Sequence, residues 1–200
     1  AAEQIAAFAA GIGARLLVVG HRGENTLNEF VLGCTALKLV YNAEVPVLLV
    51  RTPATADYAR VLVAIDRSDC SQRLAEAVPA LFPTAGCTLF SAYAVPFESR
   101  LRLSGASDAE IDALRLAERE RVETEMADFA ARLDEAGAGH YEYRLARGFA
   151  ATEILEETVE MRADLVAVGR HGGGRSEERL LGSVTQNVLY NARCDMLLMP

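Results

Sequence analysis

The sequence is poor in residues that build metal centres. Its four cysteines are scattered along 200 residues without a CxxC pair, and its three histidines do not cluster with them. Structural zinc sites need four such ligands at short, defined spacings. Metal binding by thiolates is therefore disfavoured. All four cysteines are predicted to be free thiols of a reducing compartment, and they are Cys34, Cys70, Cys87 and Cys194.

Long apolar runs and an excess of positive charge are also absent. No run approaches the ~20 apolar residues that span a bilayer, and the first ten residues lack the basic start of a signal peptide. The 28 acidic and 20 basic side chains give a net charge of −8. That charge argues against nucleic acid and against anionic lipid as the main partner. These absences predict a cytoplasmic protein with no nucleic-acid or membrane partner.

The sequence does contain an internal repeat. Residues 1–50 match residues 150–199 without a gap, at a constant offset of 149 residues that aligns Gly20 with Gly169. A repeat of this length indicates a repeated structural unit. The segment between the two copies, roughly 58–149, has no counterpart before the first copy.

The repeat predicts the domain organisation. We expect the C-terminal half of a first domain at 1–52, a linker at 53–58, and a complete domain at 59–200. A half-domain would leave an unpaired strand edge and a bare apolar face, which favours a fragment of a longer tandem protein. The alternative is that the missing strands come from elsewhere. Because the linker is short, the two units are expected to touch.

Within the complete unit, short apolar runs alternate with helical patterns. The runs are predicted strands, at 60–65, 87–94, 140–145, 164–168 and 195–199. The segments between them carry helical periodicity or helix signals, at 71–81, 108–136, 150–161 and 183–191. This alternation predicts an α/β fold, with a parallel five-stranded sheet and helices on both faces. The polar segment 97–107 is expected to be a mobile loop.

A glycine-rich segment, 169–185, carries the clearest functional signal. It follows a predicted buried strand and leads into a predicted helix. A helix N-terminus leaves backbone N–H groups unpaired and attracts phosphate. Gly172 and Gly182 let a ligand approach the backbone closely, and Ser183 and Thr185 add hydroxyl donors. The segment is therefore a candidate anion site.

The spacing of this segment resembles the ATP-binding signature of the universal stress protein family. The shared pattern is Gly, two residues, Gly, nine residues, Gly and then Ser, and the resemblance extends over 59–200. It includes a first strand that ends in Asp66 and the run from Gly182 to Val188. The resemblance implies a Rossmann-like sheet of order 3-2-1-4-5, in which the first and fourth strands are neighbours. Ligands of open α/β sheets sit at such a switch point.

The resemblance also implies a set of binding residues. In ATP-binding members the first-strand aspartate contacts the nucleoside, so Asp66 is expected to orient adenosine. The residues expected to line the ribose and phosphate cleft are Val168, Gly169, His171 and Gly172. Those expected to bind phosphate oxygens are Gly182, Ser183, Val184 and Thr185. The implied ligand is ATP with Mg²⁺ across its phosphates, bound by a regulator of the stress response; ADP and AMP are not distinguished from ATP.

Simpler interpretations of these residues stay open. Asp66 can be a helix cap alone, and the glycine loop can be a plain strand-to-helix turn, as in family members that bind no nucleotide. His140 is predicted to be an exposed strand residue. In the first copy Cys34 stands where the motif has Ser or Thr, and the aspartate strand is lacking. A thiol is a poor phosphate donor, so residues 1–58 are predicted to hold no working ATP site.

The sequence also bears on two other classes of function. Related nucleotidyl transferases use a His-x-Gly-His signature, and here neither that signature nor a G-x-x-x-x-G-K-S/T loop is present. No enzyme is therefore predicted, although slow ATP hydrolysis stays open. The third class is a structural pairing module. Family members commonly associate through their last strands, and 45–50 and 196–199 are apolar enough to pair as a homodimer or as a pseudo-dimer within one chain.

Overall fold

The strands of the chain join into one sheet. The computed structural model describes residues 1–21, 32–54, 56–139, 141–171 and 181–200. In this part of the chain the sheet has seven strands, in the order β1-β2-β7-β6-β3-β4-β5. The bounds are β1 (Leu17–Gly20), β2 (Val47–Val50), β3 (Arg60–Ala64), β4 (Gly86–Tyr93), β5 (Glu142–Arg147), β6 (Leu165–Gly169) and β7 (Asp195–Met199).

The helices lie between these strands along the chain. Their bounds are α1 (Ala2–Gly11), α2 (Cys34–Asn42), α3 (Asp69–Leu81), α4 (Glu98–Leu103), α5 (Asp108–Glu135), α6 (Ala150–Glu160) and α7 (Ser183–Asn191). Local signals set several of these boundaries. Ser107 and Glu110 form a capping box at the start of α5, and Ser68 caps α3 by accepting from the Ser71 N–H.

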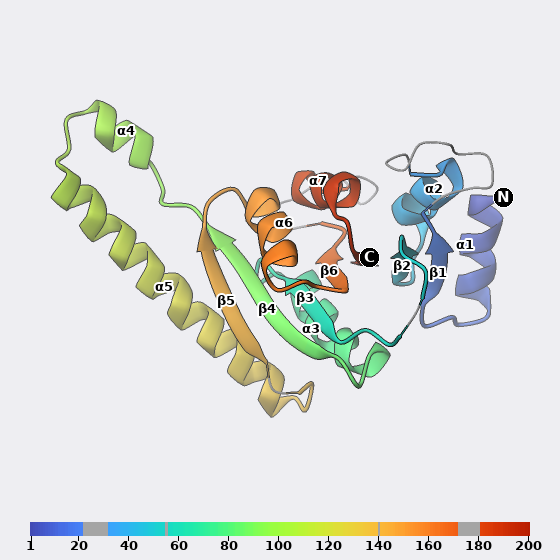
Figure 1. Cartoon of the computed structure of the whole chain (residues 1–200). Helices are drawn as coiled ribbons and strands as arrows, with labels where there is room; N and C mark the ends of the chain where they lie inside the picture. Colours follow the sequence, from blue (N-terminus) through green and yellow to red (C-terminus); the bar gives the residue numbers. More distant parts are fainter. Residues whose placement is uncertain (22–31, 55, 140, 172–180) are drawn as a thin grey trace.

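The prediction of a loop over residues 97–107 was wrong, because this segment contains α4. The reason is a set of ion pairs around Glu98, which contacts Arg102 one helical turn later and also Arg115 and Arg147. The hydrogen bond from Arg115 holds the pKa of the Glu98 carboxyl below its ordinary value, with further help from the nearby charges of Arg147 and Arg102. Figure 1 shows α4 and the first part of α5 extending beyond the sheet.

The five strands of the complete unit have the predicted order. β3 lies between β4 and β6, β5 is next to β4, and β7 is next to β6, with every pair parallel. Residues 59–200 supply five strands, as predicted, and the sheet continues past β7 with two strands from residues 1–52, so that it has seven in the described part of the chain. β2 pairs with β7 antiparallel, with Leu48 opposite Leu197, and β1 pairs with β2 in parallel. The last strands of the two units are both apolar, so each covers the other's edge.

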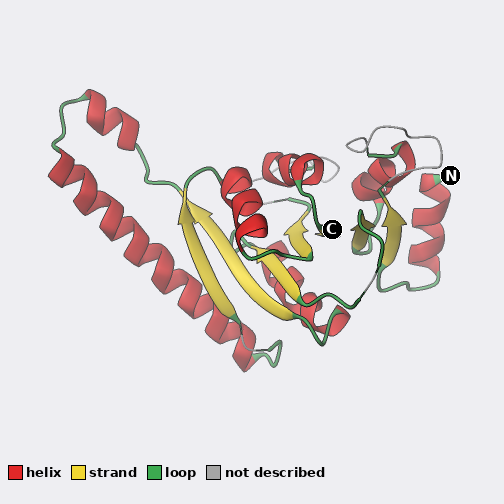
Figure 2. Cartoon of the chain, in the orientation of Figure 1, coloured by secondary structure: helices red, strands yellow, loops and turns green. Residues whose placement is uncertain are grey.

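Helices cover both faces of this sheet, as predicted (Figure 2). One apolar layer contains Val40 of α2, Ile154 of α6 and Val188 of α7. The other contains Leu74 of α3 and Phe129 of α5. Each layer removes a continuous apolar surface from water, which is the main stabilising term in folding. Within the described ranges, none of the helices is both long and apolar enough to cross a membrane.

The repeated sequence takes repeated local structure. Helices α2 and α7 begin and end at residues that differ by the offset of 149. Their N-cap glycines have nearly the same backbone angles, φ −61° and ψ 140° at Gly33 against φ −59° and ψ 149° at Gly182. In Figure 1, α1, α2, β1 and β2 lie together at the end of the sheet opposite to β5.

The linker is fixed to the complete unit by one buried carboxylate. Asp195 is 3% exposed. Its Oδ1 accepts from the backbone N–H groups of Arg51 and Thr52 at 2.8 and 3.1 Å and from the Thr52 hydroxyl at 3.0 Å, while its Oδ2 accepts from the Tyr58 hydroxyl at 2.6 Å. Because a buried carboxylate needs such donors, Asp195 holds the linker against the start of β7. Residues 1–52 are therefore in direct contact with residues 59–200.

Candidate functional site

A cavity opens at the carboxyl end of the sheet, where β3 and β6 lie side by side. Its volume is about 220 Å³. This is the predicted switch point, because the strand order reverses here. From β3 the chain continues to β4 and β5 on one side, and it later returns to β6 and β7 on the other side of β3. The lining residues are Ala64, Ile65, Asp66, Ser71, Phe90, Ala92, Ala150, Ile154, Val168, Gly169, His171, Gly182, Ser183, Val184 and Thr185.

Eight of the nine predicted binding residues line this cavity. They are Asp66, Val168, Gly169, His171, Gly182, Ser183, Val184 and Thr185. The ninth, Gly172, lies outside the described residues, as does His140. Residues more than 100 positions apart in the sequence are thus brought to one site.

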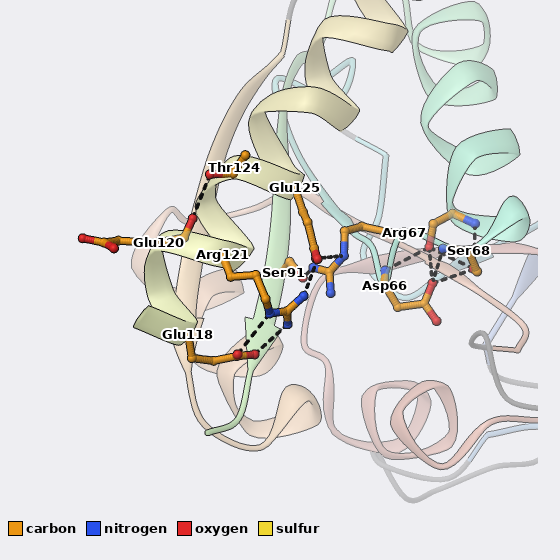
Figure 3. Close-up of polar contacts among 10 residues, drawn as sticks. Asp66, Arg67, Ser68, Ser91, Glu118, Glu120, Arg121, Thr124 and Glu125 are labelled. Carbon is orange, nitrogen blue, oxygen red and sulfur yellow. Dashed lines mark hydrogen bonds and ion pairs between the residues drawn. The ribbon is translucent and has the colours of Figure 1, made fainter. Parts of the chain in front are cut away.

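Asp66 lies in the turn between β3 and α3 and is exposed toward the cavity side of that turn. Its Oδ1 accepts from the Ser68 backbone N–H at 3.1 Å and from the hydroxyls of Ser68 and Ser71, each at 2.6 Å (Figure 3). The helix cap itself is Ser68, so the interpretation of Asp66 as the α3 cap was wrong. These bonds fix the direction of the Asp66 carboxylate before any ligand arrives.

Arg67 was missed by the sequence analysis. Its φ of 64° is in the left-handed region, which non-glycine residues rarely adopt. The side chain turns away from Asp66 toward α5, where Nε lies 3.1 Å from Glu125 Oε2 and Nη1 donates to the Ser91 hydroxyl at 3.2 Å (Figure 3). These contacts stabilise the sharp turn that places Asp66 at the cavity. A charged residue in this turn gave no sequence signal for a left-handed backbone.

The N-terminus of α7 points its first turn at the cavity. Gly182 is the N-cap, and as a glycine it has no side chain that could accept from the first turn. The N–H groups of the first turn have no acceptor within a helix, so they are available to an anion. The Thr185 hydroxyl is used differently from the prediction, because it donates to the Gly169 carbonyl at 2.7 Å. It holds the end of β6 against α7, and Ser183 is the exposed hydroxyl of this turn.

Gly169 is required by close packing. A Cβ built at this position would lie 2.8 Å from Cys70 Sγ and 3.2 Å from the His171 carbonyl oxygen. Real Cβ atoms essentially never approach a heavy atom at 2.8 Å. Helix α3 therefore packs directly on the end of β6, and this contact places the Asp66 turn beside the glycine segment.

The other half of the cavity is apolar, which the sequence analysis did not predict. Ile65 directly follows β3, Phe90 lies within β4, and Ile154 comes from α6. An apolar wall facing a few polar groups is typical of sites for small organic ligands. The usable sequence signal was the apolar character of these side chains, but the packing of α6 over β4 decided which of them face the cavity.

A larger cavity, of about 830 Å³, lies at the opposite edge of the sheet. It is lined by the linker and by the amino ends of the strands, including Arg60, Asp164 and Asp195. Each of these three side chains already bonds to neighbouring residues. The smaller cavity is the better candidate because it joins a helix N-terminus, an oriented carboxylate and an apolar wall.

The titratable groups offer no metal centre. Among the residues that the structure describes, no three His, Cys, Asp or Glu side chains are placed to hold a metal ion. Desolvation raises the pKa of the Cys87 and Cys194 thiols to about 11. Both remain protonated at neutral pH, and thiols in that form are poor metal ligands and nucleophiles.

The comparisons with known proteins agree with this architecture. The chain matches the universal stress protein family over residues 1–51 and 57–200. Because this match covers nearly the whole chain, the protein belongs to the universal stress protein family.

Solved structures share the fold. A functionally unknown protein of Pseudomonas aeruginosa PAO1 has a TM-score of 0.71 at 20% identity, over 100% of this chain and 67% of its own. A putative universal stress protein of P. aeruginosa UCBPP-PA14 has a TM-score of 0.69 at 20% identity, over 100% of this chain and 68% of its own. UspA of Lactobacillus plantarum has a TM-score of 0.58 at 20% identity, over 73% of this chain and 100% of its own.

Proposed function

We propose that residues 59–200 bind ATP in the cavity between β3 and β6, and that the protein is a nucleotide-dependent regulator rather than an enzyme. The observation that carries this proposal is the composition of the cavity. It brings an oriented aspartate, the glycine-capped N-terminus of α7 and an apolar wall to the switch point of the sheet. Each of these features fits a different part of a nucleotide.

Each feature of the cavity would contact one part of the nucleotide. The apolar wall formed by Phe90 and Ile154 suits the base, and the Asp66 carboxylate suits ribose hydroxyls, which are donors. The first-turn N–H groups of α7 and the Ser183 hydroxyl suit phosphate oxygens. With the base against the apolar wall, the phosphates would lie at Gly182 and Ser183, at the start of α7.

Mg²⁺ fits this arrangement as part of the ligand. The ion usually keeps several waters and binds through substrate phosphates with one or two carboxylates. Since Asp66 is assigned to the ribose, Mg²⁺ would be held chiefly through phosphate oxygens and its own waters. Mg²⁺ would neutralise phosphate charge, and the protein's own contribution would be the α7 N–H groups that face the phosphates.

We also propose that residues 1–52 correspond to the C-terminal half of a second such domain, joined by a linker at 53–58. The constant offset between α2 and α7 supports this division. The comparisons support it too, because UspA of L. plantarum is matched in full by 73% of this chain, whereas both Pseudomonas proteins are about half as long again as the chain.

Calorimetric titration with Mg-ATP tests the assignment, after mass spectrometry of the same sample for co-purified nucleotide. One site per chain is expected. Gly182→Val puts a β-branched side chain at the α7 N-cap and should abolish binding. The matched control is Gly33→Val, the equivalent glycine before α2, which should leave binding unchanged. Wild-type affinity in Gly182→Val would refute the site.

A purely structural pairing module is the second candidate, and the β2–β7 pairing favours it. That pairing buries apolar strands from both units without any ligand. Pairing alone predicts no calorimetric signal and no co-purified nucleotide, and the glycine segment would then be only a strand-to-helix turn. Self-association of whole chains through another surface would be measured by analytical ultracentrifugation.

A further inference from the structure

Arg170 connects the two units of the chain. It follows Gly169 at the end of β6, yet its side chain is 8% exposed. Its Nη2 donates to the carbonyl oxygen of Ala43, which is the C-cap of α2 in the other unit. Burial lowers the pKa of the Arg170 guanidinium from its ordinary value. A cation at a helix C-terminus is favourable because the last carbonyls lack partners within the helix.

The backbone of the same residue holds the candidate site. The Arg170 N–H donates to the Met199 carbonyl at 2.6 Å, and the Arg170 carbonyl accepts from the Gly182 N–H at 2.9 Å. Gly182 is the N-cap of α7. Gly169 and His171, which flank Arg170 in the sequence, line the cavity. Arg170 itself is not among the described lining residues. One residue therefore bonds to β7, to the start of α7 and to the other unit.

Comparison with the first copy of the repeat shows which contacts of Arg170 come from its backbone and which from its side chain. His21 occupies the equivalent position in the first unit, and its backbone makes the same two bonds. The His21 N–H donates to the Val50 carbonyl at 2.9 Å, and the His21 carbonyl accepts from the Gly33 N–H at 2.8 Å. The backbone bridge is thus common to both units. The contact of Arg170 with Ala43 depends on the longer guanidinium side chain.

We propose that Arg170 is a positioning residue that couples occupancy of the nucleotide cavity to the contact between the two units. The proposal rests on nucleotide binding at the cavity. A ligand on α7 restricts Gly182 and the segment around Gly169, and Arg170 cannot shift its backbone without moving its guanidinium. Coupling between two sites is reciprocal and is typically worth about 5–150-fold in affinity. The contact of Arg170 with the C-terminus of α2 therefore strengthens nucleotide binding, and bound nucleotide strengthens the contact between the units.

Hydrogen exchange in β2 measures this coupling, because β2 pairs with β7 across the junction. The intact chain is compared with and without saturating Mg-ATP, and affinity is measured by calorimetry. In the wild type, ATP should slow exchange of the Val47–Leu49 amides. Arg170→Met should remove that effect and weaken ATP binding about 5-fold or more. Arg170→Lys keeps a cation and should restore part of both effects.

Arg51→Met is the matched control. The Arg51 Nη2 donates across the same junction to the Leu189 carbonyl, near the C-terminal end of α7 rather than at its start. This variant should speed exchange in β2 while keeping the ATP-dependent difference. If Arg170→Met fails to fold, the coupling is still tested by comparing the ATP effect on β2 exchange among the wild type, Arg170→Lys and Arg51→Met.

The outcomes separate the coupling from the nucleotide assignment. Absence of ATP binding in the wild type overturns the proposed function and the coupling with it. Normal ATP binding with unchanged β2 exchange overturns the coupling alone. A retained ATP effect in Arg170→Met, or its loss in Arg51→Met, also overturns the specific role of Arg170.

Discussion

Replacement of Gly169 by alanine tests the packing that forms the candidate site. Gly169 does not have a positive φ, so alanine adds no backbone strain and the cost is steric. The new Cβ would lie 2.8 Å from Cys70 Sγ. Cys70 is in the first turn of α3, where helical sterics leave its χ1 few alternatives. Overpacking of this kind typically costs about 1–3 kcal/mol.

A second substitution isolates the responsible contact. Cys70→Ala removes Sγ and leaves the Cys70 Cβ 3.7 Å from the new atom, an ordinary van der Waals distance. The contact with the His171 carbonyl, at 3.2 Å, remains. Gly169→Ala should therefore cost clearly less in the Cys70→Ala background than in the wild type, with a coupling energy of about 1 kcal/mol or more.

The assay is a double-mutant cycle of unfolding free energies from urea titration. Wild type, both single variants and the double variant are compared under one condition. Strictly additive effects would refute the inferred contact between α3 and the end of β6. ATP titration of the same four proteins shows whether the packing also sets the cavity, since Gly169→Ala should weaken binding and the second substitution should restore part of it.

Three further predictions concern the linker and the thiols. Asp195→Ala removes the acceptor of four hydrogen bonds and should destabilise the chain by about 2–4 kcal/mol, measured by urea titration. Burial, helped by the hydrogen bond to Asp195, raises the pKa of Tyr58 above its ordinary value of 10.0. The protonated Tyr58 hydroxyl therefore contributes its full stabilisation below pH 10, and this contribution is lost as the pH rises further. In the wild type the urea midpoint should fall above pH 10, and Tyr58→Phe should make that fall shallower. An equally steep fall in both proteins would contradict this assignment. In the native protein, Cys34 is exposed and should react first with a disulfide reagent, whereas Cys87 and Cys194 should react slowly at pH 8 because their pKa values are about 11; peptide mass spectrometry over time would show the order, and early modification of Cys194 would count against its burial.

Local signals accounted for most elements of the complete unit. Apolar runs gave the strands, and α7 begins and ends at the predicted residues. The α4 helix was missed because its sequence is mostly polar, although the spacing of Glu98 and Arg102 is a helical ion-pair signal. The candidate site was largely predictable, since eight of its nine proposed residues come together. Its apolar wall and the Arg67 turn were not, because both depend on which helices pack nearby.

The sequence by itself determined the repeat, the alternation of strands and helices, and the glycine segment at a helix start. These features depend on periodicity and turn chemistry within a few residues, so they can be read along the chain. The apolar segments 45–50 and 196–199 suggested that the last strands pair, but only the tertiary structure decided that they do so within one chain and antiparallel. It alone also decided that Asp195 holds the linker and that Arg170 reaches Ala43. Such contacts join residues more than 120 positions apart, and they form only when burial of apolar surface brings the two units together. No local pattern specifies which distant backbone group a buried side chain will meet.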